Sequence, residues 1–119
     1  MLALGHSFEE RAAQWVQAQG WQILQRNYRC KLGEIDIIAE DNQQLVFIEV
    51  RARSNRRFAS AAGSVDRRKQ QKLVRAAALY LRNAGSRQNF PCRFDVIAFD
   101  PRQSGQDAEL RWIRSAFTA

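Results

Sequence analysis

Hydrophobic and polar residues alternate along several short stretches of the chain, the pattern that is typical of β-strands. These stretches lie at 21–29, 33–40, 45–53, 93–100 and 109–117. Ile, Val and Phe fill the stretches 33–40 and 45–53, whereas 21–29 is of mixed character. The short polar stretch 41–44 predicts a tight turn, so the second and third strands are expected to form a β-hairpin.

Two other stretches have apolar residues at helical spacing. The first predicts a helix over residues 6–19, with Gly20 as its stop. The second predicts a helix from about Val65 to Asn83, with Ser64 as its N-cap and Gly85 after its end. Residues 54–63 and 101–108 are predicted to form loops. The order α-β-β-β-α-β(-β) predicts one sheet flanked by helices, an α/β fold.

The chain has 119 residues, which is the size of a single domain, and we take 1–119 as one unit. Hydrophobic residues make up 45% and charged residues 26%, as in ordinary globular proteins. No apolar run approaches the roughly 20 residues of a membrane span. The first residues become acidic and amphipathic almost at once, unlike a signal peptide. We expect a cytoplasmic protein that does not bind membranes.

Cysteine and histidine are too few and too scattered to indicate a zinc site or a catalytic triad. Cys30 and Cys92 lie far apart, and His6 is the only histidine. None has a neighbour at metal-ligand spacing. We expect both cysteines to be reduced packing residues.

Three acidic residues interrupt the apolar pattern of the second and third strands. Side chains alternate across a strand, so Glu34 and Asp36 are predicted to share a face with Ile38, opposite Ile35 and Ile37. If the two strands pair as a hairpin, Asp36 and Glu49 project from the same side.

Two carboxylates in such a place favour a bound cation, because their repulsion otherwise raises a pKa. Mg²⁺ is held by one or two carboxylates together with water and substrate phosphate. The alternative is that these acids form ordinary ion pairs with nearby arginines, and the spacing leaves both open. For Asp95 in the fourth strand two alternatives are open, membership of this site or an ion pair with Arg93, and we favour a structural role.

Positive charge is concentrated in one segment. The net charge is +7, and residues 51–75 hold nine basic residues against one acid, Asp66. Basic side chains at a helix N-terminus oppose its dipole, whereas an anion there is favoured. We therefore predict contacts with nucleic-acid phosphates, which are independent of sequence and sensitive to salt. The residues expected to make them are Arg53, Arg56, Arg57, Arg67, Arg68, Lys69 and Lys72.

The acidic strands resemble a known signature. GEIDIIAED, a short turn and VFIEVR are similar to the D-x(n)-(D/E)-x-K pattern of restriction-endonuclease-like nucleases. Along nearly the whole chain the sequence resembles the YraN-like bacterial proteins, a largely uncharacterised family. The shared features are Gly5 with Glu9, Gly20-Trp21, Arg26-Asn27-Tyr28-Arg29, Gly33-Glu34-Ile35-Asp36, Glu49-Val50-Arg51, and residues 69–81.

This resemblance implies a restriction-endonuclease-like αβββαβ core, similar to archaeal Holliday junction resolvases, with one mixed sheet flanked by helices. It further implies Mg²⁺ or Mn²⁺ as cofactor, with Asp36 and Glu49 as ligands and Glu9 or Glu34 as additional ones. Asp36, Glu49 and Arg51 become the expected catalytic residues. Arg51 stands where the family signature has lysine; it can bind phosphate in a fork but cannot serve as a base.

The sequence therefore predicts a metal-dependent endonuclease for branched or structured DNA, with DNA favoured over RNA as partner. A junction-cutting enzyme needs two active sites, so a homodimer fits this version and a stable monomer would count against it. Two alternatives stay open. The first is a non-catalytic nucleic-acid-binding module that keeps the nuclease fold, which Arg51 favours. The second is an interaction protein whose basic loop binds an acidic partner.

Overall fold

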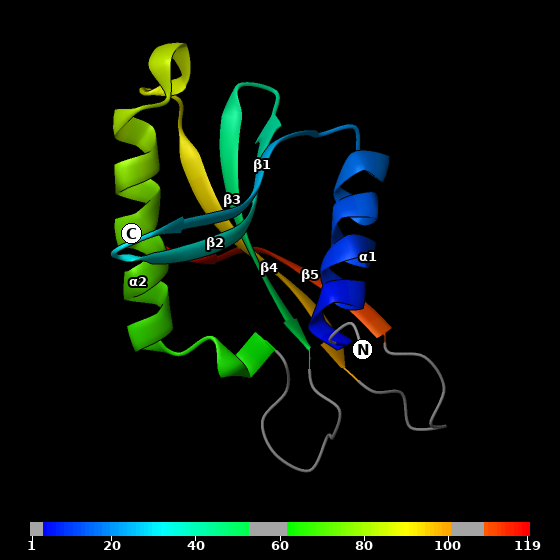
Figure 1. The fold of residues 1–119 in the computed structure, drawn as a ribbon. Coiled ribbons are helices and arrows are strands. Elements are labelled where there is room, and N and C mark those ends of the chain that lie inside the picture. The colour runs from blue at the N-terminus through cyan, green and yellow to red at the C-terminus, as the bar shows by residue number, and fades with distance from the viewer. Residues whose placement is uncertain (1–3, 53–61, 101–108) are drawn as a thin grey trace.

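A five-stranded sheet lies between two helices in the computed structural model, which describes residues 4–52, 62–100 and 109–119 (Figure 1). The helices are α1 (Leu4–Ala18) and α2 (Arg67–Arg82), and the 3₁₀ turns are η1 (Ala62–Ser64) and η2 (Gly85–Arg87). The strands are β1 (Gln22–Cys30), β2 (Gly33–Asp41), β3 (Gln44–Ala52), β4 (Cys92–Asp100) and β5 (Glu109–Phe117). The predicted α/β class and the mixed sheet flanked by helices are confirmed.

The strands follow their chain order across the sheet, and only β3 and β4 are parallel. Because β3 and β4 are parallel, the chain must cross over the sheet to join them, and this crossover connection contains α2. The two helices therefore cover opposite faces of the sheet (Figure 1). No helix within the described ranges combines the length and apolarity needed to cross a membrane.

Each face of the sheet has its own core. Under α2, the buried strand residues include Phe47, Phe94 and Val96, which pack against Leu73. Under α1, Val46, Ile48, Ile97 and Phe99 pack against Phe8 and Val16, and the rings of Phe8 and Phe99 lie 4.7 Å apart. The alternation predicted for β3 is confirmed, because Leu45 and Phe47 belong to the α2 core while Val46 and Ile48 belong to the α1 core.

The helix boundaries differ slightly from the prediction. The N-cap of α2 is Asp66, whose side chain accepts a hydrogen bond from the backbone N–H of Lys69 at 2.9 Å. The prediction of Ser64 as N-cap is therefore wrong. Asp66 is also a preferred capping residue and stands directly before the first helical residue. Ser64 instead ends η1, and its hydroxyl accepts a hydrogen bond from Arg51.

Asp95 has the structural role expected of it. Its carboxylate accepts hydrogen bonds from Arg93 Nε at 3.2 Å, Trp112 Nε1 at 2.8 Å and the backbone N–H of Ser115 at 3.0 Å. Ser115 lies where the β4–β5 register shifts, and it has a positive φ of 50°. The carboxylate thus binds an N–H group in the bulge, where the ladder is interrupted.

Candidate functional site

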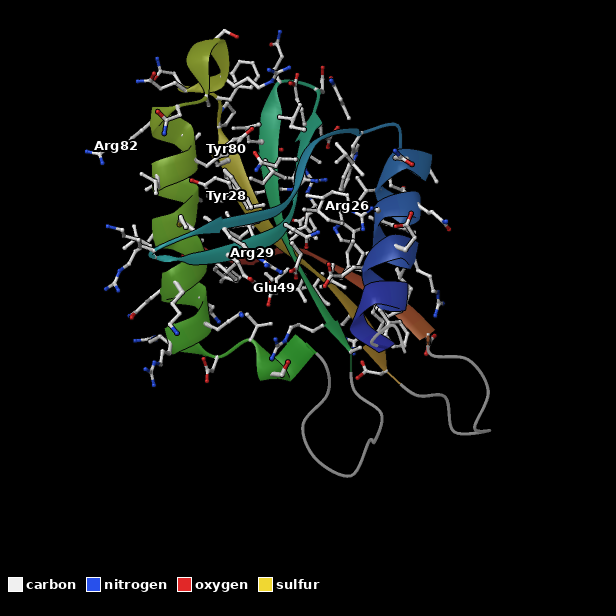
Figure 2. The ribbon with its side chains drawn as sticks, in the orientation of Figure 1. Arg26, Tyr28, Arg29, Glu49, Tyr80 and Arg82 are labelled. Carbon is white, nitrogen blue, oxygen red and sulfur yellow. The ribbon has the colours of Figure 1, made fainter. Side chains whose placement is uncertain are left out.

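The site is built on a kink in the β1–β2 hairpin. Asn27 has a left-handed φ of 53° in the middle of β1, and the register places it opposite Asp36. Asparagine tolerates this conformation better than most residues. On either side of the kink, Arg26 bonds Glu10 of α1 at 3.0 Å, whereas the ring of Tyr28 packs 5.4 Å from that of Tyr80 on α2 (Figure 2).

The same change of face occurs on β2. Ile35 and Ile38 belong to the α2 core, and Ile37 belongs to the α1 core. The predicted regular alternation, with Ile35 and Ile37 on one face, is therefore wrong. The kink runs through both β1 and β2, and at Asp36 it interrupts the regular alternation of side chains between the two faces of the sheet. As a result, the end of the hairpin bends over towards α2 (Figure 1).

At this kink β2 separates from β3. The last backbone pair between the two strands is Ile37 with Ile48, so the next positions, Asp36 and Glu49, stand at the point of separation. One oxygen of Asp36 accepts a hydrogen bond from the backbone N–H of Val50 at 2.8 Å. The Asp36 carboxylate thus binds an N–H group of β3 beyond the end of the ladder, and it lies against Glu49.

Glu49 is buried in the α2 side of the sheet, and its side chain is only 4% exposed. Oε1 of Glu49 is buried and has no hydrogen-bond partner. Burial and, to a smaller extent, the neighbouring Asp36 raise the pKa of Glu49 to about 8, against the opposing effects of Lys69 and Arg51. Burial also raises the pKa of Asp36, against the effect of the Val50 N–H group. Both shifts favour the protonated form of the pair, and a cation between the carboxylates would oppose them.

Two cationic side chains approach the same oxygen of Glu49. Lys69 Nζ lies 3.4 Å from Oε2, and Arg51 Nη1 lies 3.5 Å from it. The Arg51 guanidinium is also held by η1, because its Nε donates to Ser64 Oγ at 2.8 Å. Sequence reasoning placed Lys69 among the phosphate-binding residues and did not predict its contact with Glu49. The only signal for it was the position of Lys69 in the first turn of the second helix.

The other predicted ligands lie further out. Glu34 pairs with Arg29 at 3.3 Å, although it is close enough for its charge to raise the pKa of Asp36. Glu9 belongs to α1, which covers the other face of the sheet. Within the described part of the chain, no three carboxylate, imidazole or thiol groups are grouped to hold one metal ion. Asp36 and Glu49 are thus the acids that the fold brings together.

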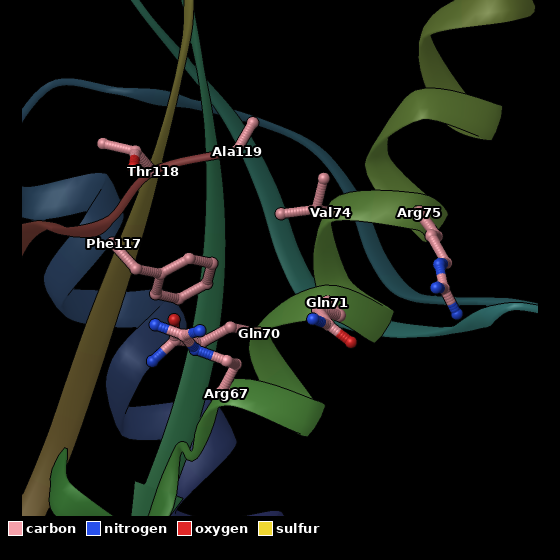
Figure 3. Close-up of a pocket in the computed structure, with 8 residues that line it drawn as sticks. All are labelled: Arg67, Gln70, Gln71, Val74, Arg75, Phe117, Thr118 and Ala119. Carbon is pink, nitrogen blue, oxygen red and sulfur yellow. The ribbon is translucent and has the colours of Figure 1, made fainter.

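The predicted phosphate-binding residues separate into four sets. Arg53, Arg56 and Arg57 lie outside the described residues. Lys69 and Lys72 face the β1–β2 turn, where they line a recess. Arg67 lies on the β5 side of α2, in a second recess of about 530 Å³ beside Phe117 (Figure 3). Arg68 is exposed in the first turn of α2.

Comparison with known proteins places the chain in a family. Residues 8–99, which include the carboxylate pair and Lys69, match the model of the Uncharacterised protein family UPF0102. A UPF0102 protein of Nitrosococcus oceani is 45% identical over 95% of this chain and 90% of its own length. Another from Pseudomonas syringae pv. syringae is 46% identical over 95% and 91%, and one from Janthinobacterium sp. (strain Marseille) is 45% identical over 97% and 87%. The chain therefore belongs to the UPF0102 family.

Proposed function

We propose that this protein is a divalent-metal-dependent nuclease that hydrolyses phosphodiester bonds in branched or otherwise structured DNA. The observation that supports this most is the buried pair of Asp36 and Glu49, with Lys69 and Arg51 against the same carboxylate. Burying two acids together is costly unless a cation balances them. The resemblance to restriction-endonuclease-like nucleases assigns this pair to catalysis.

The donor set fits Mg²⁺ or Mn²⁺. Both ions prefer carboxylate oxygen, and Mg²⁺ is usually bound through one or two carboxylates with water and substrate phosphate completing its shell. The buried Oε1 of Glu49 has no hydrogen-bond partner, so it is available as a ligand oxygen. Asp36 keeps one oxygen on Val50 N–H, which fixes the orientation of its carboxylate. A bound ion would activate water and stabilise charge on phosphorus.

The basic side chains of Lys69 and Arg51 have a different role from the metal ion. The two basic groups that now contact Glu49 Oε2 would be released towards phosphate oxygens once the carboxylates are otherwise neutralised. Lys69 reaches this position from α2, whose first turn is capped by Asp66. Arg51 is restrained by Ser64, so its guanidinium has less freedom to follow the substrate. We therefore assign the principal phosphate-directed charge to Lys69.

The proposal is tested by incubating the purified protein with four-way junction, flap, single-stranded and duplex DNA. Each substrate is combined with Mg²⁺, Mn²⁺ or EDTA. Cleavage that requires metal and favours a branched substrate is the expected result. DNA binding without cleavage under every condition would reject the nuclease and favour the non-catalytic module, which the restraint of Arg51 by Ser64 also favours. For junction cutting we further expect a dimer by light scattering, since two strands must be cut.

Lys69→Met is expected to lower the cleavage rate about 100-fold, the usual effect of removing one charge-stabilising donor. Its affinity for Mn²⁺, measured by calorimetry, should stay equal or become tighter, because a cation that competes for Glu49 is gone. Arg51→Met provides the comparison. It should mainly lower the melting temperature, because it removes the hydrogen bond from Arg51 to the hydroxyl of Ser64. A parallel loss of Mn²⁺ affinity in Lys69→Met would contradict the assignment.

A further inference from the structure

A recess of about 340 Å³ lies between the β1–β2 turn and the first turns of α2. Its lining includes Lys31 and Leu32 from the turn and Lys69 and Lys72 from the helix. These are all three lysines of the chain, whereas the 16 arginines are spread over the rest of the sequence. The recess thus concentrates compact, strongly hydrated ammonium charges, which bind phosphate as point charges.

The acid in this recess does not cancel its positive charge. Glu34 belongs to the lining, but its carboxylate is paired with Arg29 at 3.3 Å. Of the three lysines, Lys69 alone has an ion pair among the described residues, with Glu49. Lys31 and Lys72 are exposed. A phosphate entering here would meet at least two lysine side chains that form no ion pair within the described structure.

The shape of the recess depends on a close backbone contact. A Cβ added to Gly33 would lie 3.1 Å from the carbonyl oxygen of Lys72 and 3.3 Å from its Cβ. Glycine therefore lets the β1–β2 turn approach the helix backbone directly. The packing of Tyr28 on Tyr80 holds the same hairpin against α2 (Figure 2). The lysines of the turn and of the helix are brought together by this contact.

Leu32 adds an apolar surface to the recess. Its side chain is 45% exposed, and it is the one large hydrophobic residue among those described that is exposed. A nucleotide presents a phosphate next to an apolar sugar and base, whereas a free phosphate presents no such surface. Leucine is among the apolar side chains that contact bases in protein–DNA complexes, where it inserts between base steps. The lysines and Leu32 together therefore fit a nucleotide better than an isolated anion.

We propose that this recess is a subsite for one nucleotide of the bound strand, with its phosphate on Lys31 and Lys72 and its sugar or base on Leu32. The subsite lies next to the carboxylate pair of Asp36 and Glu49, because Lys69 lines the recess and its Nζ also lies 3.4 Å from Oε2 of Glu49. A strand held in the recess would thus pass directly to the carboxylates. This inference rests on the proposed function for one point, the identity of the bound strand as DNA.

The test measures binding of a fluorescent single-stranded oligonucleotide in EDTA, where no cleavage occurs, over a series of salt concentrations. The double variant Lys31→Gln/Lys72→Gln should bind about tenfold more weakly, with a salt slope smaller by about 0.7, the value for one phosphate of a single strand. Leu32→Ser should weaken oligonucleotide binding about threefold and leave the salt slope unchanged. Arg82→Gln is the matched control for the single variants Lys31→Gln and Lys72→Gln, since each removes one charge and Arg82 is exposed at the far end of α2 and points away from the protein (Figure 2).

The outcomes separate this inference from the proposed function. If Arg82→Gln lowers the oligonucleotide affinity as much as a single lysine variant does, the binding is a diffuse charge attraction. That result would overturn the subsite, even if metal-dependent cleavage is found. Lysine-dependent binding without any cleavage would support the subsite and overturn the nuclease. Competition by inorganic phosphate that is as strong per molecule as competition by a mononucleotide would overturn the role of Leu32. Melting temperatures of all variants confirm that they are folded.

Discussion

Glu49→Gln is expected to reduce metal-dependent cleavage about a thousandfold or more, which corresponds to about 4 kcal/mol of activation free energy. Glutamine preserves the shape of the side chain but replaces a carboxylate oxygen with an amide nitrogen. It therefore leaves a single neutral carbonyl oxygen in place of the carboxylate, and it removes one of the two negative charges that a metal ion would meet at the point where β2 and β3 separate. Asp36→Asn should have a similar effect on cleavage, measured with the preferred substrate in Mn²⁺.

The same substitution is expected to increase the stability of the metal-free protein at alkaline pH. The pKa of Glu49 is raised to about 8 by burial and by Asp36, from an ordinary value of 4.5. Between these values the folded protein keeps a proton that the unfolded chain releases. The free energy of unfolding of the wild type should therefore fall as pH rises from about 4.5 to 8, by an amount on the order of 5 kcal/mol.

Urea unfolding in EDTA at pH 5 and pH 8.5 checks this result. The wild type should lose stability between the two values, and Glu49→Gln should lose much less. Groups facing Glu49 are Asp36, Lys69 and Arg51, and the last two oppose the shift. Glu40→Gln is the control, because Glu40 lies near the end of the neighbouring strand β2, away from the carboxylate pair, and pairs with Arg87 at 2.6 Å. Equal pH dependence in wild type and Glu49→Gln would contradict the proposed protonation of the pair.

Asp95→Ala is expected to be the most destabilising of these changes, lowering the free energy of unfolding by about 3 to 5 kcal/mol. The Asp95 side chain is fully buried and accepts hydrogen bonds from Arg93, Trp112 and Ser115. Alanine would leave the buried guanidinium of Arg93 without its nearest counter-charge. For a domain of this size the melting temperature should fall by roughly 10 to 20 °C, measured by circular dichroism.

Two further variants separate the parts of this network. Trp112→Phe removes one donor and should cost about 1 kcal/mol. Arg111→Gln breaks an ion pair with Asp100 whose arginine is 53% exposed, and its cost should stay within about 0.5 kcal/mol. If Asp95→Ala were no more destabilising than Arg111→Gln, the buried network would not hold β4 to β5 in the way the contacts indicate.

Much of the fold followed from periodicity. The five strands and two helices have strong apolar patterns, and the hairpin turns are short, so their order and type were predictable. The kink was not, because a left-handed Asn27 has no signature in a hydrophobic pattern. The predicted faces of Ile35 and Ile37 were wrong for this reason. The N-cap was misplaced because Ser64 and Asp66 both suit the position, and only geometry distinguishes them.

The candidate site was predictable in part. Asp36 and Glu49 were expected to project from the same side of the hairpin. The register of β2 and β3 places them opposite each other, one position beyond the last backbone pair. The contact of Lys69 with Glu49 depends on where α2 lies over the sheet, which no local pattern specifies. The recess at the β1–β2 turn likewise depends on the fit of Gly33 against the helix backbone.

The confinement of all lysines to one recess also gives the protein a chemical label. Reagents that acylate side-chain amines do not react with guanidinium groups, so every lysine they modify on this chain lines the same recess. A protease that cleaves only after lysine would likewise find its sites only in the β1–β2 turn and the first turns of α2. The accessibility of this region can thus be followed in the natural sequence, without an engineered probe.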